Sequence, residues 1–229
     1  MQTRGFFITG TDTGVGKTFV TAGIAAVLKE RGVNVGVMKP VETGCAEKDG
    51  RLEPQDALYL KNAAGVSDEL DLINPYRFKA CLAPSIASKL EGKNIDFNRI
   101  KECYDTLASK HSLMLVEGAG GLLTPINEAY TVADLIKLLN LPIIIIAASR
   151  LGTINHTLLT VRYAQSNGIE VKGIILNYPT LSTDEALSTN QAEIKRFANV
   201  PVLGELPFCY ADRAPKMVKK YLKLLVLEG

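Results

Sequence analysis

A glycine-rich stretch near the start of the chain has the residue types of a loop that binds a nucleotide's phosphates. Residues 10–18 read Gly-Thr-Asp-Thr-Gly-Val-Gly-Lys-Thr, after an apolar segment and before an Ala-rich helical one. Glycines let successive backbone N–H groups turn toward phosphate oxygens, and the N-terminus of the next helix adds positive potential. The lysine can then reach the β- and γ-phosphates, and the threonine hydroxyl can ligate Mg²⁺. The residues expected to bind the nucleotide here are Gly14, Val15, Gly16, Lys17 and Thr18.

The loop departs from the standard pattern in one place. The pattern has a glycine where this chain has Thr11, and Gly10 lies one position away. An ordinary loop that contains Gly-Lys-Thr by chance is the alternative interpretation. The apolar strand before the loop and the helix after it favour a phosphate loop.

Apolar segments alternate with helical ones along the rest of the chain. The segment at 142–148 is the most apolar and holds four consecutive isoleucines. Continuous apolar runs separated by helices predict a parallel sheet covered by helices on both faces. We therefore expect a single α/β domain over residues 1–229, of the P-loop NTPase type. The expected strands lie at 6–9, 34–39, 113–116, 142–148, 171–176 and 200–203, and expected helices include 153–166 and 184–197.

Polar residues stand where several of these strands end. Lys39 and Thr43 follow the second strand, Glu117 the third, and Asn177 the strand at 171–176. Ligands of parallel sheets gather at the carboxyl ends of the strands, so these groups are suited to one phosphate-rich site. Each also has a plainer interpretation. The lysine can reach solvent from a strand end, the glutamate can face solvent, and the asparagine can belong to a turn.

A long insertion at 41–112 separates the second and third strands and lacks strong strand patterns. Pro54 and Asp56 look like the start of a helix, because proline is tolerated in a first turn and an acid there complements the helix dipole. Residues 95–109 read as an amphipathic helix. We expect this helical insertion to contribute to the substrate side of the site.

Composition narrows the class of protein. The chain has 229 residues, 47% of them hydrophobic, and a net charge of +2, which gives no electrostatic reason to expect nucleic acid as a partner. No apolar run approaches the roughly 20 residues of a membrane span, and no signal peptide is apparent, so we expect a cytoplasmic protein without a membrane partner. The four cysteines form no Cys-x-x-Cys pair and the two histidines lie far apart, which favours reduced, structural thiols over a zinc site.

Seven motifs, in order along nearly the whole chain, resemble the dethiobiotin synthetase family. They are residues 10–18, Lys39-Pro40-Val41, Gln55-Asp56-Ala57, Asn74-Pro75-Tyr76, residues 116–121, residues 151–156 and residues 203–207. The resemblance implies a homodimeric, Mg²⁺- and ATP-dependent ligase of biotin synthesis. Such an enzyme carboxylates 7,8-diaminopelargonic acid with CO₂ and closes the ureido ring through a carbamoyl-phosphate intermediate, which yields dethiobiotin, ADP and phosphate.

The resemblance also implies roles for individual residues. Lys39 corresponds to the family's active-site lysine and, with Lys17, would offset the charge that develops when a carbamate meets the γ-phosphate. The implied metal ligands are Thr18, Asp56 and Glu117. Further implied ATP contacts are Glu117, Gly118, Ala119, Gly120, Asn177, Pro207, Phe208 and Cys209. The implied substrate contacts are Thr43 and, from the dimer partner, Gly152, Thr153 and Asn155.

The sequence departs from the family at Gly14, where many members carry glutamate, so any contact of that side chain is absent. An alternative function is a molecular-switch ATPase of the partition or division-site type. Those proteins typically carry an extra lysine near positions 11–12, and this chain has none there. A cobyrinate-type amide ligase would need a glutamine-hydrolysing domain, for which there is no room. The basic and apolar run at 216–226 is either a membrane-seeking helix or a last helix packed on the domain.

Overall fold

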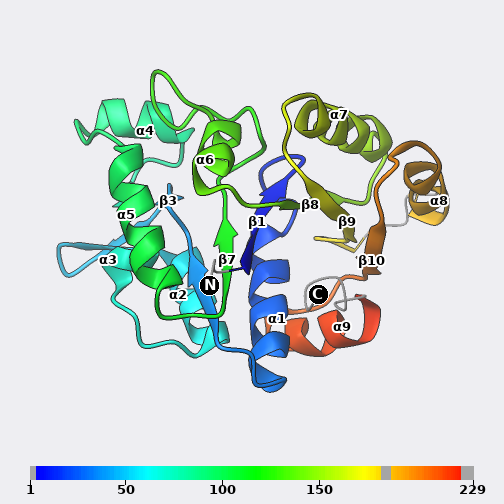
Figure 1. Cartoon of the computed structure of the whole chain (residues 1–229), viewed down its shortest axis with the longest axis horizontal. Helices are drawn as coiled ribbons and strands as arrows, with labels where there is room; N and C mark the ends of the chain where they lie inside the picture. Colours follow the sequence, from blue (N-terminus) through cyan, green and yellow to red (C-terminus); the bar gives the residue numbers. More distant parts are fainter. Residues whose placement is uncertain (1–3, 182–186, 223–229) are drawn as a thin grey trace.

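A six-stranded parallel sheet forms the centre of the protein, as the sequence predicts. The structure, a computed structural model, describes residues 4–181 and 187–222. The strands lie in the order β10-β9-β8-β1-β7-β2, and all five neighbouring pairs are parallel (Figure 1). Their bounds are β1 Arg4–Gly10, β2 Val35–Met38, β7 Leu113–Glu117, β8 Ile143–Ala148, β9 Val171–Asn177 and β10 Val202–Leu206.

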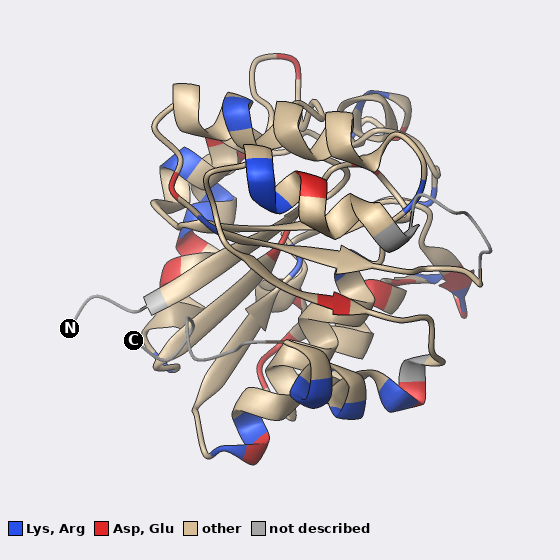
Figure 2. Ribbon diagram, turned by 90° about the vertical axis from the view of Figure 1, so that its right-hand side faces the viewer, with Lys and Arg blue, Asp and Glu red and all other residues tan. Residues whose placement is uncertain are grey.

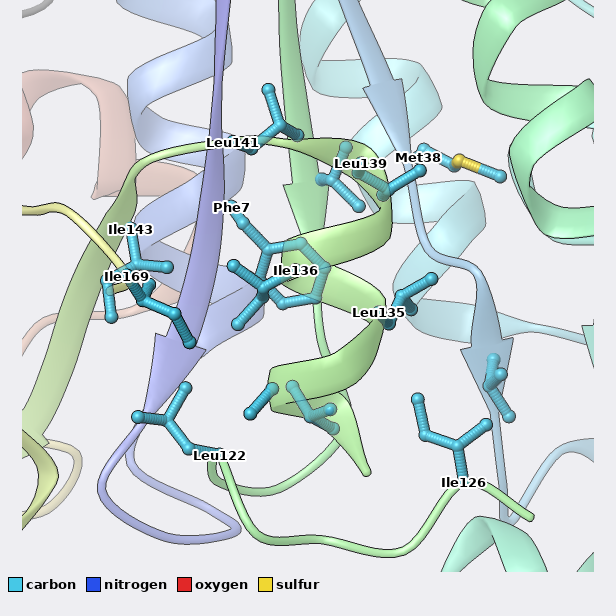
Figure 3. Packing of buried hydrophobic residues seen from close by; sticks show 14 of the residues in the cluster. Phe7, Met38, Leu122, Ile126, Leu135, Ile136, Leu139, Leu141, Ile143 and Ile169 are labelled. Carbon is cyan, nitrogen blue, oxygen red and sulfur yellow. The ribbon is translucent and has the colours of Figure 1, made fainter. Parts of the chain in front are cut away.

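Helices cover both faces of the sheet, because successive side chains of each buried strand point to opposite faces. Phe7 joins a core cluster with one set of helices, and its neighbours Phe6 and Ile8 join a second cluster with the other set. Figure 3 shows Ile136 of α6 next to the Phe7 ring. The first set comprises α5 (Phe97–Ala108), α6 (Val132–Leu139), α7 (Thr153–Ser166) and α8 (Leu187–Phe197). The second comprises α1 (Lys17–Glu30), α2 (Gln55–Ala64) and α9 (Ala214–Tyr221), which follows the short 3-10 helix Ala211–Arg213.

The insertion between β2 and β7 contains helices, as expected, and also short strands that the sequence did not reveal. β3 (Val41–Glu42) pairs in parallel with β6 (Tyr76–Arg77), and β4 (Ala46–Lys48) forms a hairpin with β5 (Arg51–Glu53). The strands are two or three residues long and pair with one another rather than with the main sheet, so no apolar periodicity marks them. The other helices of the insertion are α3 (Leu70–Ile73) and α4 (Pro84–Leu90).

Most predicted elements differ from the observed ones by one to three residues at their ends, and the last strand differs most. The last strand begins two residues later than expected, at Val202, and includes Gly204, where the pairing with β9 shifts register. Helix α8 ends at Phe197 as predicted, and residues 182–186 before it lie outside the described part of the chain.

The basic run at 216–226 begins inside α9, which packs on α1. Val218 is buried there, and a Cβ added to Gly23 would lie 2.6 Å from its Cγ2 atom, so the two helices meet at a glycine. This packing favours a last helix of the domain over a membrane-seeking one. Residues 223–226 lie outside the described range, and none of the helices in that range is long and apolar enough to cross a membrane. Charged residues of both signs are interspersed, mainly on helices and loops (Figure 2).

Candidate active site

The predicted phosphate loop connects β1 to α1 and depends on its glycines. Gly14 has φ 73° and Gly16 φ 91°, both in the left-handed region that glycine adopts most easily. Gly16 is also crowded, because an added Cβ would lie 2.2 Å from the Nδ2 atom of Asn177, whereas a Cβ at Gly14 would meet nothing within 4 Å. The backbone conformation expected from the motif is therefore present.

Asn177 supports this loop from the end of β9. Its side chain is buried, and its Nδ2 donates a hydrogen bond of 2.9 Å to the carbonyl of Val15. The sequence predicts a contact with the nucleotide base, which stays a prediction. The structure adds a second task for this residue, since the bond ties the loop to a strand two places away in the sheet.

Lys17 opens α1 and folds back over the loop. Its Nζ donates to the backbone carbonyl of Asp12 at 2.9 Å, and the side chain is largely buried. Burial, followed by the positive charge of Lys39, lowers the pKa of Lys17 to about 8, although Glu117 and other carboxylates act in the opposite direction. Among residues 4–181 and 187–222, no carboxylate forms an ion pair with this lysine.

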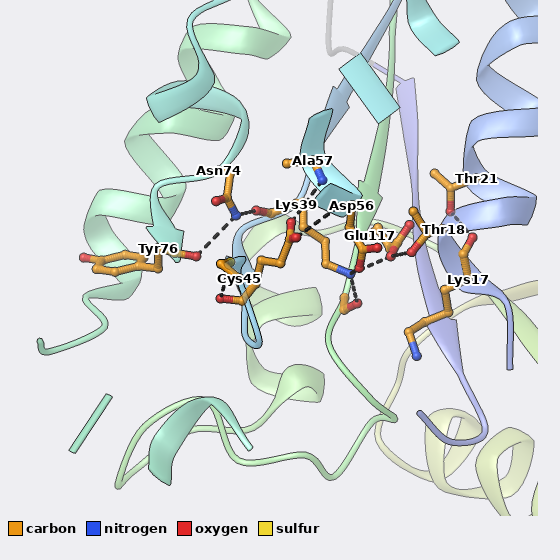
Figure 4. A network of polar contacts seen from close by, with 12 residues as sticks. Lys17, Thr18, Thr21, Lys39, Cys45, Asp56, Ala57, Asn74, Tyr76 and Glu117 are labelled. Carbon is orange, nitrogen blue, oxygen red and sulfur yellow. Dashed lines mark hydrogen bonds and ion pairs between the residues drawn. The ribbon is translucent and has the colours of Figure 1, made fainter. Parts of the chain in front are cut away.

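Lys39 stands at the centre of a cluster that joins three predicted residues from different elements (Figure 4). Its Nζ donates to Asp56 Oδ2 at 2.9 Å and to Glu117 Oε1 at 2.6 Å. The Thr18 hydroxyl donates to the same Glu117 oxygen at 2.7 Å. Burial disfavours the charged lysine, but the two carboxylates outweigh it and raise its pKa. The prediction that polar residues at the ends of parallel strands lie close together is therefore confirmed for Lys39 and Glu117. Asp56 joins them from the start of α2.

The donor set of this cluster fits a hard cation such as Mg²⁺. Glu117 Oε2 is buried and has no hydrogen-bond partner among the described residues, and the Asp56 side chain is 42% exposed. Two carboxylates and the Thr18 hydroxyl are oxygen ligands of the kind Mg²⁺ takes, with water and phosphate oxygens completing its shell. No group of three or more His, Cys, Asp or Glu residues in the described ranges is arranged to hold a metal alone.

The glycines after β7 lie beside the phosphate loop. A Cβ at Gly118 would lie 2.7 Å from the Phe7 ring, and one at Gly121 would lie 3.1 Å from the carbonyl of Gly10. Gly120 has φ 66°, and the Thr124 hydroxyl accepts a hydrogen bond from the Gly121 N–H at 3.0 Å. The segment that contains the predicted residues Gly118, Ala119 and Gly120 is thus adjacent to the phosphate loop, where small residues are required.

The predicted substrate residues lie on two separate elements. Thr43 follows β3 and is partly buried. Gly152 caps α7 with φ 91°, Thr153 is buried, and Asn155 is exposed. None of these residues, all inside the described ranges, hydrogen-bonds to Lys39, Asp56 or Glu117. Their contribution to substrate binding stays a prediction.

Pro207, Phe208 and Cys209 follow β10 and are partly buried. The Tyr178 N–H donates to the carbonyl of Leu206 at 3.0 Å, which places the start of this segment next to the end of β9. The Phe208 ring meets the Tyr210 ring edge-on at 5.8 Å. The segment therefore begins next to Asn177 at the end of β9. Its contact with ATP stays a prediction.

Asn74 is a residue whose role the sequence did not reveal, although it lies in one of the family-like motifs. Its Nδ2 donates to the carbonyl of Lys39 at 2.6 Å and to that of Tyr76 at 3.2 Å. The Lys39 N–H donates in turn to the carbonyl of Ile73 at 2.8 Å. The backbone that carries the central lysine is therefore clamped on both sides by the insertion.

Glu42 is the second residue that sequence reasoning missed. Its carboxylate is buried, and it accepts hydrogen bonds from the backbone N–H groups of Asp56 and Ala57. The proline before α2 is a sequence pattern that indicates the need for such a residue. Pro54 has no side-chain oxygen to cap the helix, so the helix needs an acceptor from another part of the chain.

The sequence is similar to known proteins over nearly its whole length, and the relatives described below share one name. A family model described as an AAA domain matches residues 4–211. The ATP-dependent dethiobiotin synthetase BioD of Thermodesulfovibrio yellowstonii is 45% identical over 233 residues, which cover 98% of this chain and 97% of that protein. The protein of the same name from Bacillus subtilis strain 168 is 46% identical over 228 residues, with coverage of 98% and 97%.

Solved structures show the same fold at low sequence identity. A ParA family ATPase from Chlorobium tepidum is 18% identical with a TM-score of 0.55, and the alignment covers 98% of this chain and 92% of that one. The septum site-determining protein MinD from Pyrococcus horikoshii, complexed with Mg-ADP, is 19% identical with a TM-score of 0.55 and coverage of 93% and 86%. These matches confirm the P-loop NTPase type of fold that the sequence predicts.

Proposed function

This chain belongs to the family of ATP-dependent dethiobiotin synthetases, and from that premise we propose that it joins CO₂ to 7,8-diaminopelargonic acid and closes the ureido ring of dethiobiotin. The enzyme is an ATP-dependent ligase, so ATP is a co-substrate and ADP and phosphate are products. The proposal takes the cytoplasm as its place of action, because that is where ATP and bicarbonate are supplied. The observation that supports it best is the Lys39 cluster beside the phosphate loop.

The reaction has three steps. One amine of the substrate attacks CO₂, which forms a C–N bond and releases a proton, and the product is a carbamate. A carbamate oxygen then attacks the γ-phosphorus of ATP, and ADP leaves. Finally the second amine attacks the carbonyl carbon of the carbamoyl phosphate, the C–O bond to phosphate breaks, and hydrogen phosphate leaves with the amine's proton.

The second step brings two anions together, and the residues present can counter this repulsion. Lys17 would contact the β- and γ-phosphates, and the loop N–H groups would bind the same oxygens. When bound, Mg²⁺ would neutralise charge on the phosphates, and Thr18, Asp56 and Glu117 are the residues that would hold it. The protein contributes a preassembled set of charges, which costs no reorganisation during the reaction.

Lys39 would hold the carbamate through the weakest of its present contacts. An ammonium group has three donors, and here they face Asp56, Glu117 and the carbonyl of Gly118. The contact with Gly118 is 3.4 Å long, against 2.9 Å and 2.6 Å for the carboxylates. A carbamate oxygen can replace this carbonyl while both ion pairs remain.

We further propose that the active site is shared between two protomers of a homodimer. The start of α7 would bind the distal carboxylate of the substrate in the partner's site, since the N-terminus of a helix favours anions. Leu151, two residues before α7, is 81% exposed, and Leu159 within α7 is 60% exposed, which suits a surface that another protomer covers.

Mixing two inactive variants tests the shared site. Lys39→Ala and Asn155→Asp would each be inactive alone if both residues serve the reaction. A mixed dimer contains one site with neither substitution when Lys39 and α7 come from different protomers, so equal mixing should restore about one quarter of the activity. Mixtures that stay inactive despite exchange of protomers would contradict the shared site, and sedimentation velocity would report the oligomeric state.

The proposed function is tested by phosphate release from MgATP and bicarbonate, with and without 7,8-diaminopelargonic acid, and by mass spectrometry of the product. We expect release that depends on the diamine and yields dethiobiotin. ATP hydrolysis at the same rate with and without the diamine, and without a ureido product, would contradict the ligase activity. It would favour a molecular-switch ATPase, in line with the ParA family ATPase and MinD that share the fold.

A further inference from the structure

Helix α2 begins without a cap of its own. The residue before it is Pro54, whose side chain makes no capping hydrogen bond. The first N–H groups of a helix have no partner within the helix, and an uncapped start is costly where water is excluded. Because Ala57 is fully buried, its N–H group needs an acceptor from elsewhere in the protein.

Glu42 supplies that acceptor from strand β3. Its Oε1 accepts from the Asp56 N–H at 2.9 Å, and its Oε2 accepts from the Ala57 N–H at 3.0 Å. These are the second and third residues of α2, the positions that a capping side chain normally serves. Glu42 is 6% exposed, and its own carbonyl accepts from the Phe78 N–H at 2.9 Å, so the capping group is itself fixed.

The same helical residue that receives this bond carries a carboxylate of the site. The Asp56 backbone is held by Glu42, and the Asp56 side chain accepts from Lys39 Nζ at 2.9 Å. Lys39 continues the chain of contacts to Glu117 at 2.6 Å. A shift of α2 would therefore move one of the two carboxylates that hold the central lysine.

The use of a glutamate from another strand as the cap of α2 also needs an explanation. A buried carboxylate next to Asp56 is repelled by it, and a serine at position 54 could cap the helix without that repulsion. The cap comes instead from β3, which lies between Lys39 and Thr43 along the chain. One short segment thus carries the lysine, the cap that fixes the lysine's partner and a predicted substrate residue.

We propose that Glu42 is a positioning residue of the active site, which holds the Asp56 carboxylate against Lys39 by capping α2 from a neighbouring strand. This inference rests on the proposed function of Lys39 and Asp56. Glu42 does not itself touch substrate in this proposal. Its effect on the reaction passes through the placement of α2.

The test compares Glu42→Ala, which removes both acceptors, with Glu42→Gln, which keeps one acceptor oxygen. We expect kcat to fall about tenfold in Glu42→Ala and less in Glu42→Gln, because small displacements of catalytic groups slow the chemical step. The KM for ATP should change less than about threefold, since the phosphate loop keeps its contacts. Glu47→Gln is the control, because Glu47 is an exposed carboxylate of the same insertion that pairs with Lys79, and its kcat should equal that of the parent protein.

A rescue variant separates positioning from direct contact. Pro54 has an extended backbone (φ −79°, ψ 96°), so Glu42→Ala/Pro54→Ser places a capping hydroxyl at the helix start. Hydrogen–deuterium exchange of the first turn of α2 reports whether the cap is restored. We expect kcat and protection of this turn to rise and fall together across the parent, the three Glu42 variants and the Glu47→Gln control.

Divergence of the two measurements overturns the proposal. A protected first turn with low kcat would mean that Glu42 acts directly on the substrate, and an unprotected turn with normal kcat would mean that the cap is irrelevant to the reaction. The parent protein distinguishes the two hypotheses. If the parent protein forms dethiobiotin and Glu42→Ala has the same kcat, only the positioning role is contradicted. If the parent protein forms no dethiobiotin, the proposed function is contradicted.

Discussion

Two lysines in neighbouring regions of the site are held in opposite ways. Lys17, over the phosphate loop, donates to a backbone carbonyl, and its pKa is lowered to about 8. Lys39, directly after β2, donates to two carboxylates, which raise its pKa although burial acts in the opposite direction. Lys17 thus has no carboxylate within ion-pair distance among the described residues, whereas the charge of Lys39 is more than balanced by two carboxylates of the protein itself.

The two regions also differ in what builds them. The phosphate loop is shaped by backbone conformation at Gly14 and Gly16 and by the support of Asn177. The Lys39 cluster is assembled from side chains on β2, α1, α2 and β7, with the insertion clamping the lysine backbone through Asn74. A change in the first region should therefore affect nucleotide binding, and a change in the second should affect the step after binding.

Removal of the loop lysine should have the largest effect. Lys17→Ala removes the cation that we propose contacts the β- and γ-phosphates, so we expect turnover to fall by at least about 1,000-fold and ATP affinity to fall with it. Steady-state assays and calorimetric titration with ATP measure the two quantities. Unchanged ATP affinity would contradict the phosphate-binding role of this lysine.

Removal of the cluster lysine should separate the two quantities. Lys39→Ala should reduce turnover about 100-fold and leave ATP affinity within about threefold of the parent value. It also leaves Glu117 buried without its cation, so the free energy of unfolding should fall by about 3 kcal/mol. Near-normal turnover in a folded Lys39→Ala protein would show that this region is structural only, and Lys39→Arg, which keeps the charge, is the matched comparison.

The lowered pKa of Lys17 predicts proton uptake when ATP binds. At pH 8 about half of the free protein carries a neutral Lys17, and binding of the phosphates favours the charged form, so about half a proton per ATP should be taken up. The uptake should shrink as the pH falls below the pKa, because the lysine is then already charged. Calorimetry in buffers of different ionisation enthalpy measures it, and Lys17→Ala should abolish it.

Gly14→Glu should have the smallest effect. A side chain at this position meets open space, but φ of 73° is unfavourable for any residue except glycine. We expect destabilisation of about 1 kcal/mol, a melting temperature lower by about 2–4 °C and little change in Lys39-dependent turnover. A large loss of turnover with normal ATP binding would mean that the loop and the cluster are coupled more closely than their separate contacts indicate.

The main features of fold and site follow from patterns that the sequence displays directly. The run of isoleucines in β8 predicts a strand buried on both faces, and the rule that ligands gather at carboxyl ends brings Lys39 and Glu117 together correctly. The bonds of Glu42 and Asn74 could not be predicted, because both side chains bind backbone groups and both residues lie in an insertion whose short strands show no periodicity. The hydrogen bond by which Asn177 supports the phosphate loop could not be predicted for a related reason. Its acceptor is the backbone carbonyl of Val15, and every residue type has such a carbonyl.

The packing of α9 on α1 has a consequence for the order in which the protein can form. During synthesis β1 and α1 emerge before the segments that pack on them, because β7 and β8, the neighbours of β1 in the sheet, and then α9 all follow later in the sequence. Contacts between such distant segments form slowly, because long loops must close first. Helix α1 is therefore synthesised well before the helix that packs on it, which leaves its apolar face available to chaperones during synthesis.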